Sequence, residues 1–214
     1  MDSRARLSAW LLCALALPAA AGLARAQQPD DLRAARTKGS ATAPVTMYIM
    51  SDFECPWCGD FARNTFPIIE REYVATGKMK IVFVNMPLSI HKNAEPAAEV
   101  AMCAARQNKF WQIHDLLFRH QSDWSDLDEP GPYFLSLGDS AGADRAQLTA
   151  CLQTAATRPL VKADYDGSLR TGAHSTPSFY IEGGLMSGAE PMDVFRPILD
   201  SIIRVKTRRP APGR

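Results

Sequence analysis

The sequence predicts an α/β domain built on a mixed four-stranded sheet. The apolar run at 45–50 predicts a buried strand, and a second strand at 80–86 holds an unbroken apolar run at 81–84 that is typical of buried parallel strands; a helical segment separates them. A long stretch of helical periodicity follows, over about residues 92–172. Two short strands and a final helix complete the chain, so we expect helices flanking the sheet and an inserted helical subdomain.

The first strand, helix and second strand form a crossover unit. The helix is expected from about Pro56, and Pro67 should kink it or end its first half near Phe66. Because strand–helix–strand crossovers are right-handed, the two strands should pair in parallel.

The helical stretch contains four apolar stripes with spacings of three and four residues. Strand character returns only at 178–181, and Gly183 and Gly184 then predict a hairpin turn into a fourth strand. The dipeptide Glu190-Pro191 opens the last helix. The stripes are Ala97/Val100/Ala101/Ala104, Phe110/Ile113/Leu117/His120, Leu148/Cys151/Leu152/Ala155 and Val161/Tyr165/Leu169.

The N-terminal residues predict export. Arg4 and Arg6 precede an apolar segment, and Ala24-Arg25-Ala26 offers the small-x-small pattern of a signal peptidase site. We therefore interpret residues 1–26 as a cleaved signal peptide and expect a periplasmic or otherwise extracytoplasmic protein. The alternative is a membrane anchor, although the apolar segment is shorter than the ~20 residues that span a bilayer.

The rest of the chain is expected to form one domain. Residues 27–43 are polar and predict a linker, 44–205 the domain, and 206–214 a disordered tail. The 24 basic and 23 acidic residues nearly balance, which argues against nucleic acid as a partner. The histidines lack the spacing of metal ligands, and the acidic residues at 123–129 lack that of a calcium loop, so no metal site is expected.

Cys55 and Cys58 are the leading candidates for catalysis. They stand at the junction between the first strand and the following helix, where free N–H groups and the helix dipole stabilise a thiolate. Such a site can lower a thiol pKa from about 8.5 to roughly 3.5–7.5. Cys58, one turn further on, could close a disulfide with Cys55. The alternatives are half of a zinc site or two inert thiols.

The chain resembles the thioredoxin fold in its DsbA-family form. The resemblance rests on Cys55-Pro56-Trp57-Cys58 after a strand, on the helical insertion, and on Thr176-Pro177 before a later strand, and it covers about 44–205. It implies that Pro177 is the family's cis-proline, and that the backbone at Thr176 lies against the sulfurs and accepts a client chain as an added strand. Without the resemblance, Thr-Pro would indicate only a turn.

The resemblance implies an exported thiol–disulfide oxidoreductase. Cys55 would be the nucleophile and Cys58 the resolving thiol, with no cofactor besides the Cys55–Cys58 disulfide. The implied partners are secreted client proteins and a membrane redox partner that recycles the disulfide, and we expect a monomer. An oxidase is favoured; the alternatives are a reductase or isomerase of the cell envelope, or a non-catalytic client-binding chaperone.

Three residues near the cysteines should tune the redox potential. Pro56 and Trp57 lie between the cysteines, and Trp57 replaces the histidine of the strongest oxidases. Glu54 should oppose the Cys55 thiolate by like charge. A potential less oxidising than about −120 mV is therefore expected. Trp57 could equally contact clients or cover the active-site helix.

Cys103 and Cys151 each lie on the apolar stripe of a helix. Such positions suit a structural disulfide between two packed helices, and some members of the resembled family carry a second disulfide at similar places. The alternative is a pair of buried free thiols that behave as small apolar residues.

Overall fold

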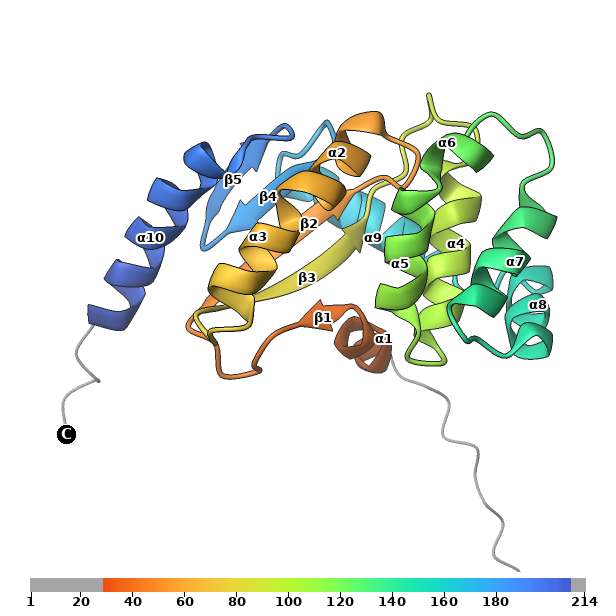
Figure 1. The fold of residues 1–214 in the computed structure, drawn as a ribbon, viewed down its shortest axis with the longest axis horizontal. Helices are drawn as coiled ribbons and strands as arrows, with labels where there is room; N and C mark the ends of the chain where they lie inside the picture. The colour runs from red at the N-terminus through yellow and green to blue at the C-terminus, as the bar shows by residue number, and fades with distance from the viewer. Residues whose placement is uncertain (1–28, 209–214) are drawn as a thin grey trace, which may run out of the picture.

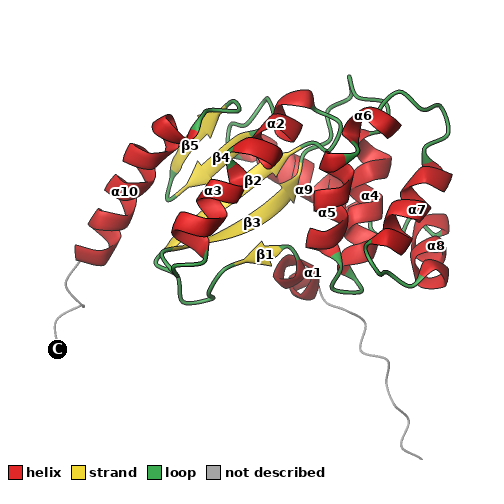
Figure 2. Ribbon diagram, viewed as in Figure 1, coloured by secondary structure: helices red, strands yellow, loops and turns green. Residues whose placement is uncertain are grey.

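The computed structural model describes residues 29–208 and contains a five-stranded mixed sheet with helices on both faces (Figures 1 and 2). The strand order is β1-β3-β2-β4-β5, with β2 parallel to β3 and the other pairs antiparallel. The strands are β1 (Thr37–Lys38), β2 (Val45–Ser51), β3 (Met79–Asn85), β4 (Ser178–Ile181) and β5 (Gly184–Ser187).

The helices form two groups, one around the sheet and one in the insertion between β3 and β4 (Figure 1). Around the sheet are α1 (Pro29–Ala35), α2 (Pro56–Asn64), α3 (Phe66–Ile69), the π-helix η1 (Glu70–Val74) and α10 (Met192–Arg208). The insertion contains α4 (Ala94–Ala105), α5 (Phe110–Arg119), α6 (Gln121–Trp124), α7 (Gly131–Ser140), α8 (Arg145–Gln153) and α9 (Arg158–Arg170).

The thioredoxin-like α/β fold predicted from the sequence is confirmed, but the sheet has five strands instead of four. The fifth strand, β1, pairs with β3 through Thr37↔Val82 and Lys38↔Ile81. It lies with α1 in the segment predicted as a linker. A strand of two residues has too little alternation to be recognised, because its pairing depends on the edge of β3.

Both ends of the chain also bear on the predictions. The predicted signal peptide at 1–26 lies outside the described residues. At the other end, α10 continues to Arg208, so 206–208 are helical instead of belonging to a disordered tail. Lys206 forms an ion pair with Glu182, which ties this last turn to the β4–β5 hairpin. Within 29–208, no helix is long and apolar enough to cross a membrane.

Strand β2 is buried on one face and partly buried on the other. Val45, Met47 and Ile49 pack against the aromatic core that α2, α3 and α10 contribute, which includes Phe61 and Phe195. The alternate side chains of β2 point to the opposite face. This burial explains why most residues of β2 are apolar, and the cysteines follow directly after the end of the strand.

The helix after β2 is interrupted where Pro67 predicts it. Helix α2 ends at Asn64 and α3 begins at Phe66, with Thr65 between them. The Thr65 N–H still donates to the Phe61 carbonyl, at 3.0 Å. The short α2 therefore carries the cysteines, while α3 and η1 return the chain to β3.

The insertion packs around α4, whose residues from Ala97 to Ala105 are all buried. Small alanine side chains let α5, α7, α8 and α9 approach this helix closely. Cys103 on α4 and Cys151 on α8 form a disulfide with a Cα–Cα distance of 5.9 Å. The bond joins two helices that are 48 residues apart in sequence.

This disulfide should contribute strongly to stability without taking part in turnover. Closing a loop of this length stabilises by about 4 kcal/mol in the chain-entropy model. We expect Cys103→Ala/Cys151→Ala to lower the free energy of unfolding in urea by about 4 kcal/mol. The measurement uses a Cys55→Ala/Cys58→Ala background, which holds no other thiol pair. Peptide mapping without reductant should recover Cys103 linked only to Cys151. An unchanged unfolding midpoint, or a link to Cys55 or Cys58, would contradict the structural role.

Candidate active site

Cys55 is the N-cap residue of α2, directly beyond the loop that follows β2. Its backbone is extended (φ −64°, ψ 121°), and Pro56 occupies the first position of the helix, where no N–H is required. The free N–H groups of Trp57 and Cys58 are therefore directed at the Cys55 sulfur, and both lower its pKa. The sequence local to Cys55 thus builds an anion-stabilising helix end.

The two thiols differ sharply in chemistry. The hydrogen bond from Cys58 is the main cause that lowers the pKa of Cys55 to about 6, and partial burial opposes it. Cys58 is fully buried, and this burial raises its pKa well above the ordinary value, as does the neighbouring Cys55. Both thiols are reduced in this structure. Cys55 is therefore the thiolate and Cys58 its protonated partner.

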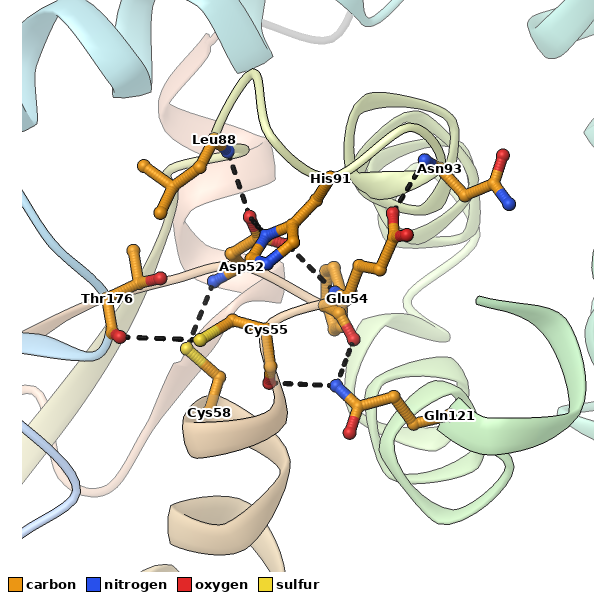
Figure 3. A network of polar contacts seen from close by, with 10 residues as sticks. Asp52, Glu54, Cys55, Cys58, Leu88, His91, Asn93, Gln121 and Thr176 are labelled. Carbon is orange, nitrogen blue, oxygen red and sulfur yellow. Dashed lines mark hydrogen bonds and ion pairs between the residues drawn. The ribbon is translucent and has the colours of Figure 1, made fainter. Parts of the chain in front are cut away.

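The loop before β4 lies against the Cys55 sulfur (Figure 3). The Cys55 thiol donates to the Thr176 carbonyl at 3.4 Å, and the Thr176–Pro177 peptide bond is cis. The Thr176 Oγ1 is buried and has no partner within the described chain. This hydroxyl can donate to the thiolate once Cys55 loses its proton, and Thr176 contributes to the low pKa of Cys55 in this way.

Asp52 holds the loop that precedes Cys55. Its side chain is fully buried and accepts from the N–H groups of Glu54 and Leu88, each at 2.8 Å. The same carboxylate lies 2.7 Å from Nδ1 of His91, which follows β3 (Figure 3). The Asp52 N–H points to the Cys58 sulfur at 3.5 Å. One residue thus connects the loops after β2 and β3 and contacts the buried thiol.

Glu54 is placed differently from its predicted role beside the Cys55 thiolate. Its carboxylate turns away from both sulfurs and accepts from the Asn93 N–H at the start of α4, at 2.6 Å (Figure 3). Burial is the main cause that raises the pKa of Glu54. The side chain therefore fixes the first turn of α4 to the active-site loop.

Gln121 holds the same loop from the helical insertion. Its Nε2 donates to the carbonyls of Phe53 and Cys55, at 2.7 and 2.9 Å. Gly59 makes room for this side chain, because a Cβ at that position would fall inside the Gln121 amide. The glycine directly after Cys58 is thus required by a residue 62 positions later in the sequence.

The remaining predicted residues lie at the surface or in the core. Trp57 is 67 % exposed beside Cys55, and Ile90, in the loop that Asp52 holds, is 80 % exposed. His114 is buried among aromatic rings, and this burial lowers its pKa. His120 pairs with Asp123. Among residues 29–208, no group of three or more His, Cys, Asp or Glu side chains could hold a metal ion.

Three residues of this site were not recognised from the sequence: the partnered Asp52, His91 and Gln121. Their bonds join segments 36 to 68 residues apart. Asp52 lies three residues before Cys55 in the sequence. The signal that could have found it is its place at the carboxyl end of a buried strand, where a charge requires partners.

The sequence model described as thioredoxin matches residues 32–201. The chain belongs to the thioredoxin family. Two solved structures share the fold of this thioredoxin-family protein. BdbD from Bacillus subtilis has a TM-score of 0.71 at 24% identity, covering 79% of this chain and 92% of BdbD. α-DsbA1 from Wolbachia pipientis has a TM-score of 0.72 at 20% identity, covering 80% of this chain and 92% of α-DsbA1.

Curated relatives of this thioredoxin-family protein carry two kinds of name. Disulfide bond formation protein D of Bacillus subtilis is 25% identical, over 78% of this chain and 77% of its own length. The Na⁺/H⁺ antiporter NhaA 3 of Salinispora tropica is 27% identical over 98% of this chain. The chain spans 33% of the length of that antiporter.

The low pKa of Cys55 predicts a distinctive pH dependence. Alkylation of the reduced protein by iodoacetamide should have its midpoint near pH 6, because only the thiolate reacts, and should label Cys55 before Cys58. Cys58→Ala should raise this midpoint, since it removes the largest stabilising hydrogen bond. A midpoint near the ordinary value of 9.0 would contradict the assignment.

The same shift should make stability depend on pH. Between about 6 and 9.0 the folded Cys55 is ionised while the unfolded thiol still holds its proton, so the reduced protein should gain stability as pH rises. The slope is at most about 1.4 kcal/mol per pH unit. Cys55→Ser should remove this slope. The gain is lost again as pH falls through the folded pKa.

Proposed function

We propose that this protein is an exported thiol–disulfide oxidoreductase that introduces disulfides into secreted client proteins through Cys55 and Cys58. The observation that carries the proposal is the contrast between the two thiols: Cys55 at a helix end with a pKa of about 6, and Cys58 buried with a raised pKa. Two inert structural thiols would not be expected to differ in pKa in this way. The membership in the thioredoxin family and the names of the disulfide bond formation relatives support the same activity.

The reaction begins with the Cys55–Cys58 disulfide. A client thiolate attacks the Cys55 sulfur, the bond to Cys58 breaks, and Cys58 takes up a proton, as its high pKa favours. A second client thiolate then attacks the client sulfur of this mixed disulfide and releases Cys55. The Cys55 thiolate is a good leaving group because its pKa is low. The client loses two electrons and the pair gains them.

Client binding is assigned to the surface around Cys55. The Thr176–Pro177 segment lies against the sulfur and offers its backbone to an added strand. Trp57 and Ile90 are large exposed apolar side chains, and exposed aromatics of this kind serve as anchors at protein interfaces. We assign client contact to Trp57, in preference to a covering role, because 67 % of it remains exposed.

The direction of electron flow follows from compartment and potential. Residues 1–26 carry the export signal pattern, and the bacterial periplasm is kept oxidising. A Cys55 pKa of about 6 lies between about 3.5 for the strongest oxidase and about 7 for thioredoxin. The oxidase would act as a monomer, with no cofactor besides its disulfide, and a membrane redox partner would reoxidise it. A reductase or isomerase remains the second candidate.

Variants of the two cysteines test the activity. Cys55→Ser should abolish oxidation of reduced ribonuclease, and Cys58→Ser should accumulate mixed disulfides with the client, visible on gels without reductant. Cys103→Ala/Cys151→Ala is the matched control and should keep turnover. A wild-type protein that leaves both ribonuclease and insulin unchanged while preventing client aggregation would instead identify a chaperone.

The redox potential decides the direction. In a glutathione titration we expect a value between roughly −180 and −270 mV. Trp57→His should shift it toward about −120 mV, because an imidazolium beside Cys55 further stabilises the thiolate. Trp57→Phe is the control and should leave it unchanged. A wild-type value at or above about −120 mV would contradict the tuning by Trp57, and one below about −270 mV would favour the reductase.

A further inference from the structure

A cavity of about 400 Å³ lies between α9 and the sheet, on the face opposite the β2 side chains that pack against α2 and α3. Its floor consists of side chains from the three central strands, namely Met50 on β2 and Val82 and Val84 on β3, with Tyr48 and Tyr180 beside them. Its walls come from α9 and from the end of α1. This volume falls within the range of small-molecule sites.

The charged groups of the cavity do not balance. Arg36 is neutralised, because Asp164 accepts from both of its terminal nitrogens and also from Asn85. Arg33 and Arg170 line the same cavity, and neither has an ion pair or a side-chain hydrogen bond with the side chains described, those of residues 32–208. Two guanidinium groups are therefore free to bind an anion at this place, and carboxylates suit their planar geometry.

The two tyrosines supply both aromatic surface and polar groups. The ring centroids of Tyr48 and Tyr180 lie 6.5 Å apart, with the ring planes tilted by 56°. Their hydroxyls have no hydrogen-bond partner in the described part of the chain. The floor can thus hold an apolar ring while the rim offers donors, which is the usual combination in ligand sites.

Gly167 keeps one wall of the cavity recessed. It lies within α9, where glycine is the least favourable residue apart from proline. A Cβ at this position would meet only the Arg170 guanidinium, at an ordinary contact distance of 3.6 Å. Packing within the protein therefore does not require glycine here, and a side chain larger than alanine at this position would extend into the cavity.

We propose that this cavity binds a small organic carboxylate with an aromatic body. The carboxylate would lie between Arg33 and Arg170, and the ring would lie on the floor against Tyr48 and Tyr180. The site is separate from the two cysteines, because it lies across the sheet from α2. It is therefore independent of the proposed redox function.

Isothermal titration calorimetry tests the proposal. Naphthoate is titrated into the oxidised wild-type protein. We expect saturable binding of one naphthoate per chain, weakened at least about tenfold in Arg33→Gln/Arg170→Gln. Arg204→Gln, an exposed cation on α10, is the control for net charge and should bind as the wild type does. The neutral alcohol naphthalenemethanol should bind at least about tenfold more weakly, since it lacks the charge.

A second pair of variants separates cavity shape from charge. Gly167→Leu should abolish naphthoate binding by filling the cavity, with the thermal midpoint retained or raised, while Gly167→Ala should keep measurable binding. No saturable binding by the wild type would overturn the proposal. So would undiminished binding in Gly167→Leu or in the double arginine variant.

Discussion

A buried carboxylate at the carboxyl end of β2 holds the reactive part of this protein together. The side chain of Asp52 has no access to water, so its charge is tolerable only with partners. Those partners come from two loops: the N–H of Glu54 before α2, and the Leu88 N–H and His91 imidazole after β3. Since β2 and β3 are parallel neighbours, the two loops emerge at the same edge of the sheet. Asp52 fixes one loop against the other.

The contrast between the cysteines follows from this fixed loop. Beyond Asp52 the chain reaches Cys55 at the N-cap of α2, and Cys58 in the first turn is buried. The hydrogen bond from Cys58 and the N–H groups of the helix end lower the pKa of Cys55, whereas burial raises the pKa of Cys58. The Thr176 carbonyl closes the remaining side of Cys55. The difference in pKa between Cys55 and Cys58 therefore comes from their surroundings, since the two side chains are chemically identical.

The parts of the structure that depend on local pattern were predictable from sequence, and the parts that depend on long-range pairing were not. Apolar runs predict strands β2 and β3, and Pro56 indicates the start of the helix after Cys55. Strand β1 is too short to do so. The contact of Glu54 with the Asn93 N–H was not predicted, because it joins two segments that are far apart in sequence. The bonds of Gln121 depend on the packing of the insertion, which no local pattern reveals.

The contact between Gln121 and the active-site loop limits how this fold can be modified. Two carbonyls next to the reactive thiol receive their hydrogen bonds from the insertion, and Gly59 in α2 is shaped to admit the donor. The helical insertion therefore cannot be removed or exchanged without affecting the active-site loop. Grafting it onto a smaller thioredoxin would require a glycine after the second cysteine and a glutamine at the start of α6. Removing it would take the Gln121 donor from the Phe53 carbonyl and would leave the Cys55 carbonyl with only the N–H of Gly59, inside α2.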